Sequence, residues 1–142
     1  MINSFTGRYI FLNNSYPVKI VHEGIEYPSL EHYHLSMRIK SDQQVNGSFI
    51  SFIDCRELIS KMKNISDVRF LIRNFKIRKD WDSVKSEIIK WGIREKFNNE
   101  DLKKMLIETG DLELLDEDNF GNYLMEIRED FKNDNKSLPK GL

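Results

Sequence analysis

The sequence predicts an α+β fold in which helices dominate a small N-terminal sheet. Short apolar runs separated by turn residues stand before Pro28, and apolar residues recur at spacings of three and four after it. The chain has 142 residues, of which 39% are hydrophobic, and its formal net charge is −1. This length and composition favour one folded domain, which we expect over residues 1–132 with a polar tail over 133–142. The near-neutral charge argues against a general nucleic-acid binder, although a local basic cleft remains compatible with it.

The N-terminal segment predicts short strands followed by a helix. Glu23 and Gly24 supply a turn between the second and third strands. Ser29 is expected to cap a helix that begins at Leu30. The strands that we expect cover residues 8–12, 18–21 and 25–27.

After a polar link over residues 41–47, apolar periodicity predicts further helices, so that the chain should hold five or six in all. Asp80 is expected to cap the longest of them, and Gly110 to end the next one in a left-handed conformation. These later helices are expected from Phe49 to Met62, Ser66 to Phe75, Trp81 to Phe97, Asp101 to Thr109, and Phe120 to Phe131.

The sequence lacks the motifs that several classes of chemistry require. Cys55 is the single cysteine, so an intrachain disulfide and a cysteine-based metal cluster are excluded. His32 and His34 are two positions apart, and on a helix they point about 200° away from each other and cannot share a metal. We therefore expect no metal and no redox cofactor. No basic leader and no membrane-length apolar run is present, so an intracellular, cytoplasmic protein is expected.

Polar side chains of different chemical types cluster at two predicted helix starts. Residues 27–33 read Tyr-Pro-Ser-Leu-Glu-His-Tyr, and residues 78–85 read Arg-Lys-Asp-Trp-Asp-Ser-Val-Lys. In this order and spacing they resemble the Trp-Pro-x-x-Glu-His-Tyr and Arg-x-x-Trp-x-x-Val-Lys segments of the YbiA-like, or NADAR, family. Matches at 11–14, 94–97 and 121–128 extend the resemblance over roughly residues 5 to 131. The resemblance implies a YbiA-like fold.

The resemblance also implies an activity. The family is similar to N-glycosidases that cleave the bond between ribose C1 and a nitrogen in phosphorylated riboflavin-pathway intermediates, and other members are linked to ADP-ribose, including ADP-ribose on nucleic-acid bases. Glu31 is the predicted catalytic residue, because a carboxylate can stabilise the positive charge on the ribose ring or activate water. The ligand would be a small molecule or nucleic acid that carries ribosyl phosphate or ADP-ribose. The predicted substrate-binding residues are Asn13, Tyr27, His32, Arg78, Trp81 and Lys85.

Arginine offers a planar fork for phosphate and lysine a compact charge, which suits Arg78 and Lys85. Tyr27 or Trp81 would stack on the base, and Asn13 would orient the sugar. Each residue also has a structural interpretation. Glu31 suits the dipole of a helix N-terminus, and Trp81 begins an apolar helix face. His32 suits a bond to a backbone carbonyl.

The sequence departs from the family between residues 116 and 120. Members carry a loop with Asn-Asp and Trp-Gly there, but only residues 117–119 stand in its place. The alternative function is therefore a catalytically reduced member that binds ADP-ribose, nucleotides or a protein. A compact viral form would suit this shortening and would place the protein in a host cytoplasm.

A basic stretch offers a different alternative. Residues 69–79 are rich in Lys and Arg with Phe70 and Phe75 between them, a composition that can contact nucleic acid. The helical pattern places both aromatic rings on the apolar face, so we do not expect them to form stacking platforms.

Overall fold

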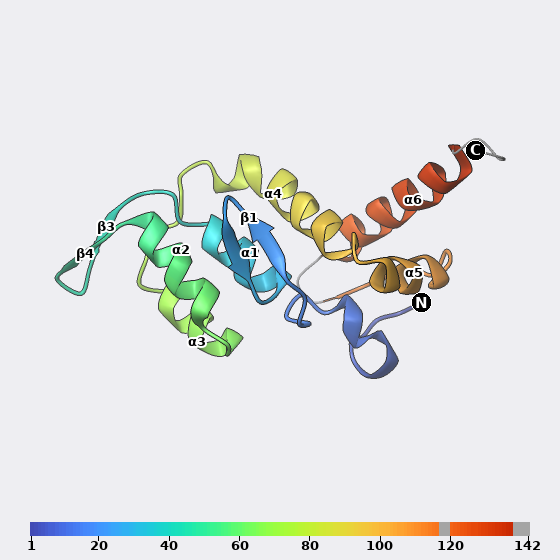
Figure 1. Cartoon of the computed structure of the whole chain (residues 1–142), viewed down its shortest axis with the longest axis horizontal. Coiled ribbons are helices and arrows are strands. Elements are labelled where there is room, and N and C mark those ends of the chain that lie inside the picture. The colour runs from blue at the N-terminus through green and yellow to red at the C-terminus, as the bar shows by residue number, and fades with distance from the viewer. Residues whose placement is uncertain (117–119, 138–142) are drawn as a thin grey trace. The chain divides into compact units, whose positions relative to one another are not determined.

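The computed structural model describes residues 1–116 and 120–137, which fall into two compact units (Figure 1). Residues 14–92 form one unit, and residues 1–13 with 93–142 form the other. Helix α4 (Trp81–Lys96) contributes to both, since Ile93 is the first of its residues that belongs to the second group. The fold is mostly helical with small antiparallel sheets, which confirms the predicted class.

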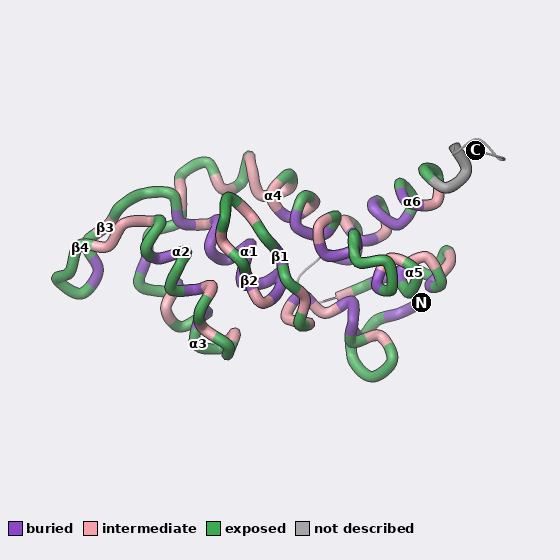
Figure 2. Tube along the Cα trace, viewed as in Figure 1, coloured by how far each residue is buried: buried purple, intermediate pink, exposed green. Residues whose placement is uncertain are grey.

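The unit of residues 14–92 is built around helix α1 (Leu30–Met37). All eight residues of α1 are buried (Figure 2, where buried residues are purple). Helix α1 packs on α2, α3 and the first hairpin. Ser29 caps α1 as predicted, because its side-chain oxygen accepts from the backbone N–H of His32. The other elements are β1 (Ile20–His22), β2 (Ile25–Tyr27), β3 (Gln43–Val45), β4 (Ser48–Ile50), α2 (Phe52–Lys61) and α3 (Ile65–Ile72).

Two hairpins occur in this unit, and each turns on a pair of residues with positive φ. Strands β1 and β2 pair with Ile20 opposite Tyr27, and the predicted turn at Glu23 and Gly24 has φ values of 49° and 80°. The hairpin β3–β4 has the same kind of turn at Asn46 and Gly47.

The second hairpin corrects the predicted polar link over 41–47 and the predicted helix start at Phe49. Phe49 and Ile50 lie in β4, and α2 begins only at Phe52. Ser51 explains that start, because its side chain accepts from the N–H of Asp54. Helix α3 likewise begins at Ile65 rather than Ser66, with Asn64 as its N-cap.

The unit of residues 1–13 and 93–142 contains η1 (Gly7–Leu12), α5 (Glu100–Glu108), α6 (Gly121–Ser137) and the end of α4. An isolated bridge joins Ile2 to Leu114. Gly110 has a φ of +67° and follows α5 as predicted. The apolar residues buried in this unit are Ile2, Phe5, Phe11, Leu12, Ile93, Phe97, Leu102, Leu106, Leu114, Phe120, Leu124, Ile127 and Phe131.

The predicted strand over 8–12 is wrong, because these residues form the 3₁₀-helix η1. Phe11 and Leu12 are both buried, whereas neighbours in a strand point to opposite faces. The inward position predicted for Met105 is also wrong, since it is 37% exposed. Helix α6 continues past Lys132 to Ser137, and the short segment 117–119 lies outside the described residues.

Candidate functional site

The candidate site lies in the unit of residues 14–92, at the N-terminal turn of α1. Glu31 is in that first turn, where backbone N–H groups lack helical partners. Its own N–H donates to the carbonyl oxygen of Asn14 at 2.8 Å. The cap at Ser29 and this bond fix the backbone that carries the Glu31 side chain.

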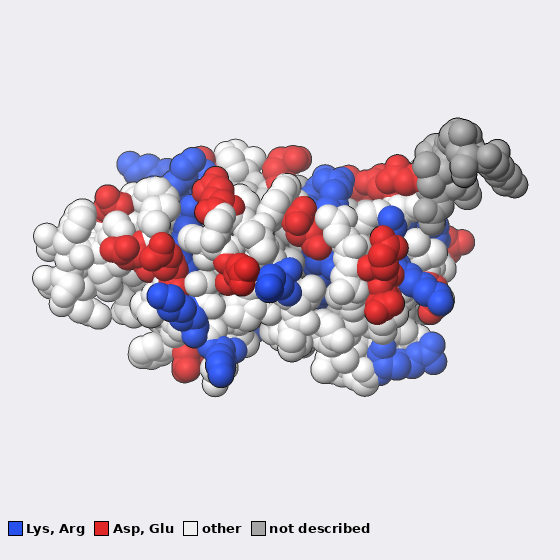
Figure 3. All heavy atoms as spheres, in the orientation of Figure 1, with Lys and Arg blue, Asp and Glu red and all other residues white. Residues whose placement is uncertain are grey.

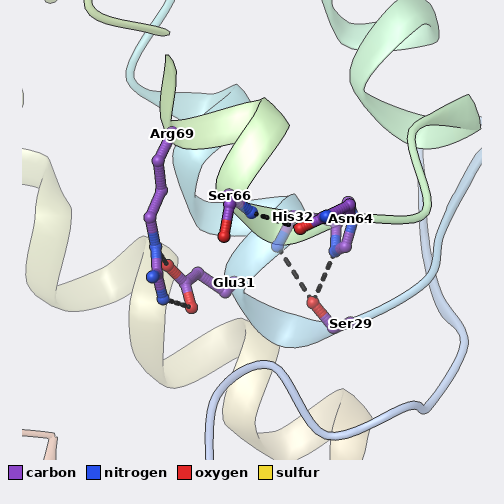
Figure 4. Close-up of polar contacts among 6 residues, drawn as sticks. All are labelled: Ser29, Glu31, His32, Asn64, Ser66 and Arg69. Carbon is purple, nitrogen blue, oxygen red and sulfur yellow. Dashed lines mark hydrogen bonds and ion pairs between the residues drawn. The ribbon is translucent and has the colours of Figure 1, made fainter. Parts of the chain in front are cut away.

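The Glu31 carboxylate forms a two-pronged ion pair with Arg69 of α3 (Figure 4). Nε of Arg69 donates to Oε2 at 2.6 Å, and Nη2 donates to Oε1 at 2.7 Å. The Glu31 side chain is 9% exposed and that of Arg69 is 51% exposed. The nearly buried carboxylate is therefore held by a cation that reaches it from the solvent side. Because a carboxylate has about four acceptor positions, each oxygen keeps capacity for a further donor.

His32 connects the same turn to the segment between α2 and α3. Its Nε2 lies 2.7 Å from the carbonyl oxygen of Met62, and its Nδ1 lies 2.6 Å from Oγ of Ser29. A carbonyl oxygen only accepts, so Nε2 carries a proton, and in the neutral ring Nδ1 accepts from the Ser29 hydroxyl. Burial lowers the pKa of His32, which favours that neutral ring. His32 thus fixes the approach of α3 to α1, and both ring nitrogens are engaged within the protein.

Arg78 lies at the other end of α1. Its backbone N–H donates to the carbonyl of Arg38, and Nη1 donates to that of Met37. Its Nε and Nη2 donate to the two carboxylate oxygens of Asp80 at 2.6 and 3.0 Å. These hydrogen bonds to Asp80 raise the pKa of Arg78. Glu31 and Met37 are six positions apart, so these two ends of α1 are about 9 Å apart along the helix axis.

Trp81 and Lys85 stand at the start of α4. Trp81 is half-buried, and the guanidinium of Arg38 lies 5.5 Å from the centroid of its ring system, a cation–π distance. Nζ of Lys85 lies 3.7 Å from Oδ1 of Asp82; the Lys85 side chain is about half exposed and that of Asp82 is almost fully exposed. The carboxylate of Asp80, which the sequence predicts as a helix cap, pairs with Arg78.

Tyr27 is placed differently from a stacking platform. It is 1% exposed, and its ring packs edge-on against Tyr33 with centroids 6.0 Å apart. Burial raises the pKa of the Tyr27 hydroxyl. Tyr27 supports α1 from β2 and leaves Trp81 as the more accessible aromatic ring of the predicted pair.

Asn13 belongs to the other unit, where it follows η1. Its carbonyl oxygen accepts from Nζ of Lys96 at 2.8 Å. Lys96 is 1% exposed, and burial lowers its pKa to about 7. The sequence pattern gave no reason to expect a buried lysine on Asn13.

Arg69 is the other residue that sequence reasoning missed. In the sequence it is one of several cations in a basic stretch, but in the structure it pairs with Glu31, which lies 38 positions earlier. A pairing at such separation leaves no signal in local spacing.

No group of three His, Cys, Asp or Glu side chains that could hold a metal occurs within the described part of the chain. In the same described residues, no helix is long and apolar enough to cross a membrane.

Comparisons with known proteins give three concordant matches. The family model described as NADAR domain matches residues 3–123. A riboflavin biosynthesis protein of Vibrio vulnificus (strain YJ016) is 29% identical over 107 residues, which are 73% of this chain and 26% of that protein. The chain thus spans about a quarter of that relative's length. The NMR structure of the E. coli protein YbiA shares the fold, with a TM-score of 0.78 and 20% identity over 99% of this chain and 88% of that one.

Proposed function

The chain belongs to the NADAR domain family, and on that premise we propose that it hydrolyses the bond between ribose C1 and a nitrogen. The substrate class is a ribosyl phosphate or a base that carries ADP-ribose. One observation carries the proposal. Glu31 stands in the first turn of a buried helix with both carboxylate oxygens held by Arg69.

The proposed reaction needs a negative charge beside C1. As the C–N bond breaks, its electron pair leaves with the nitrogen and positive charge develops on the ribose ring. Water forms the new bond to C1, and one of its protons passes, directly or by way of Glu31, to the leaving nitrogen of the base. Arg69 fixes the direction of the carboxylate, so Glu31 does not have to be reoriented when the charge develops.

Arg78 and Lys85 would hold the phosphate. Their partners in this structure, Asp80 and Asp82, are exposed carboxylates with side chains 51% and 96% accessible. A phosphate can replace such a carboxylate because it presents the same kind of acceptor with greater charge. Trp81 would cover the base. Tyr27 and His32 would support α1 rather than touch the ligand, since the Tyr27 ring packs on Tyr33 and both ring nitrogens of His32 are engaged within the protein.

The direct test is release of the base. Purified protein is incubated with phosphorylated riboflavin-pathway intermediates and with ADP-ribosylated oligonucleotides, and free base and sugar phosphate are separated by chromatography. Wild-type protein should release both products, and Glu31→Gln should retain the fold but lose release. Release by neither protein from any of these substrates would contradict the proposal.

A second candidate is a binding module without turnover. The observation that favours it is in the sequence, where only residues 117–119 replace the Asn-Asp and Trp-Gly loop of the family. Calorimetry with ADP-ribose separates the two candidates. Saturable binding of ADP-ribose together with intact substrates after long incubation supports the module, whereas product release supports the hydrolase.

A further inference from the structure

Two apolar side chains that the sequence pattern places in the core are exposed in the structure. Phe70 of α3 is 70% exposed, so the prediction that it lies on the apolar helix face is wrong. Met105 of α5 is the second such residue. Its side chain lines a cavity between η1 and α5, where an apolar group can contact a bound molecule.

The cavity has a volume of about 220 Å³ and lies within the unit of residues 1–13 and 93–142. Its apolar wall is formed by Phe11, Met105 and Leu112. A protein cavity of about 150 Å³ can hold benzene, so this one suits a molecule of about nine non-hydrogen atoms. That size is smaller than a nucleotide and matches an amino acid.

The buried part of the cavity wall is held in place by hydrogen bonds. Thr109 lines the cavity and is buried. Its Oγ1 donates to the carbonyl oxygen of Leu106 at 2.6 Å and accepts from Nη1 of Arg128 at 2.9 Å. Phe11, which lines the same cavity, is also buried. A ligand would therefore meet a wall that is already ordered, which lowers the entropic cost of binding.

Arg8 and Glu108 bring opposite charges to this cavity. Both are exposed, and neither forms an ion pair with any residue in the described part of the chain. The guanidinium of Arg8 lies 4.8 Å from the centroid of the Tyr9 ring, a cation–π distance that orients it. Glu108 is the last residue of α5, where the helix dipole also favours a cation.

The surface around the cavity combines these charges with apolar groups. The space-filling view shows side chains of both signs beside uncharged surface over η1 and α5 (Figure 3). A single cation or anion would be attracted by one of the two charged residues and repelled by the other. A molecule that carries both charges next to an apolar chain complements the whole cavity.

We propose that this cavity binds a free α-amino acid with an apolar side chain. The ligand carboxylate accepts hydrogen bonds from the Arg8 guanidinium, whose fork matches it, and the ligand ammonium donates to the Glu108 carboxylate. The apolar side chain contacts Met105 and Leu112. This inference does not rest on the proposed hydrolysis, because Glu31 belongs to the other unit.

The experiment titrates the full chain with leucine and three analogues, and follows the backbone amide signals by NMR. Among the analogues, 4-methylpentanoate lacks the ammonium group, 3-methylbutylamine lacks the carboxylate, and glycine lacks the apolar side chain. Leucine should shift the amide signals of residues 8–11 and 105–112 saturably. Each analogue should bind about 3- to 30-fold more weakly, since it loses one of the three contacts.

Variants of the protein assign each charge to its partner. Arg8→Gln should weaken leucine binding about 3- to 30-fold and should not weaken binding of 3-methylbutylamine, which has no carboxylate. Glu108→Gln should weaken leucine binding to a similar extent and should not weaken binding of 4-methylpentanoate. Lys104→Gln and Glu113→Gln are the matched controls, because both residues are exposed and neither lines the cavity. They should bind leucine as the wild type does.

Three results would overturn the proposal. The first is the absence of saturable shifts with leucine up to about 10 mM, the weakest affinity expected for a ligand of this size. The second is equal affinity for leucine and all three analogues, which would show that neither charge is recognised. The third is equal weakening of leucine binding by the cavity variants and their controls.

Discussion

Arg69 donates hydrogen bonds to both carboxylate oxygens of Glu31, at 2.6 and 2.7 Å, and the two residues come from different helices. The pair therefore joins α3 to the first turn of α1. Its two members differ in environment, because the Glu31 side chain is nearly buried and that of Arg69 is half exposed. Loss of the arginine should consequently cost more than the loss of an ordinary surface ion pair.

Arg69→Met should lower the free energy of unfolding by about 1–3 kcal/mol, because the Glu31 carboxylate is left without its main partner. Adding Glu31→Gln should recover part of that loss, since the uncompensated charge is removed. Urea unfolding of the two single variants and the double variant measures the coupling. Arg73→Met is the control, because Arg73 is exposed and forms no ion pair with the residues that the structure describes, and it should change stability by less than about 0.5 kcal/mol. Strict additivity of the two changes would contradict a coupled pair.

His34 should make the protein sensitive to acid. Burial lowers its pKa to about 3, against 6.5 for an unfolded chain. Below pH 6.5 the unfolded state therefore binds a proton that the folded state does not, and stability falls by up to about 1.4 kcal/mol per pH unit until pH 3. Between pH 6.5 and 4, the free energy of unfolding measured with urea should fall less for His34→Gln than for the wild type. Above pH 7, the two proteins should show the same change of unfolding free energy with pH. Equal slopes below pH 6.5 would show that His34 is protonated in the folded state.

Lys96 should give the free energy of unfolding a second pH dependence, above neutral pH. Burial lowers its pKa to about 7, against 10.5 in an unfolded chain. Between these values the unfolded state holds the extra proton, so the contribution of Lys96 to stability rises with pH from 7 to 10.5. The unfolding free energy of the wild type minus that of Lys96→Met should therefore rise over that pH range. A difference that stays constant with pH would exclude a buried neutral amine.

Gly92 should resist substitution although it lies inside helix α4. A Cβ there would lie 2.6 Å from Cδ1 of Leu30 and 2.7 Å from Cε2 of Tyr33, both on α1. Gly92→Ala should therefore destabilise the protein by about 1–3 kcal/mol, even though alanine favours a helix by about 1 kcal/mol. Glu87→Ala, at an exposed position of α4, is the control and should have little effect on the melting midpoint. A stabilised Gly92→Ala would mean that α1 and α4 are less closely packed.

Local signals predicted the elements whose causes are local. Ser29 caps α1, and the Glu23–Gly24 pair forms the turn between β1 and β2. Both features are predictable because a cap and a two-residue turn depend on residues within four positions of each other. The Asn46–Gly47 turn carries the same signal, but its strands are only three residues long and polar at Gln43 and Gln44, so the sequence pattern favours a link there. The fold class followed from the periodicity of the later helices.

The candidate site was predicted only in part, because its electrostatics depend on contacts far apart in sequence. Glu31 was identified through the resemblance, but its partner Arg69 comes from another helix. Phe70 was misplaced because the periodicity of an eight-residue helix does not fix which side meets the core. The pairing of Arg78 with Asp80 was likewise hidden, since Asp80 also suits a helix cap.

The measurement that tests the central proposal most directly is the single-turnover rate of base release by wild type, Glu31→Gln and Arg69→Lys. Glu31→Gln keeps the size of the side chain and removes its charge, so the rate should fall by about 10²- to 10⁴-fold. Arg69→Lys should retain part of the rate, because a cation remains but the two-pronged contact is lost. Wild-type release that is unchanged in Glu31→Gln would contradict a catalytic role for Glu31.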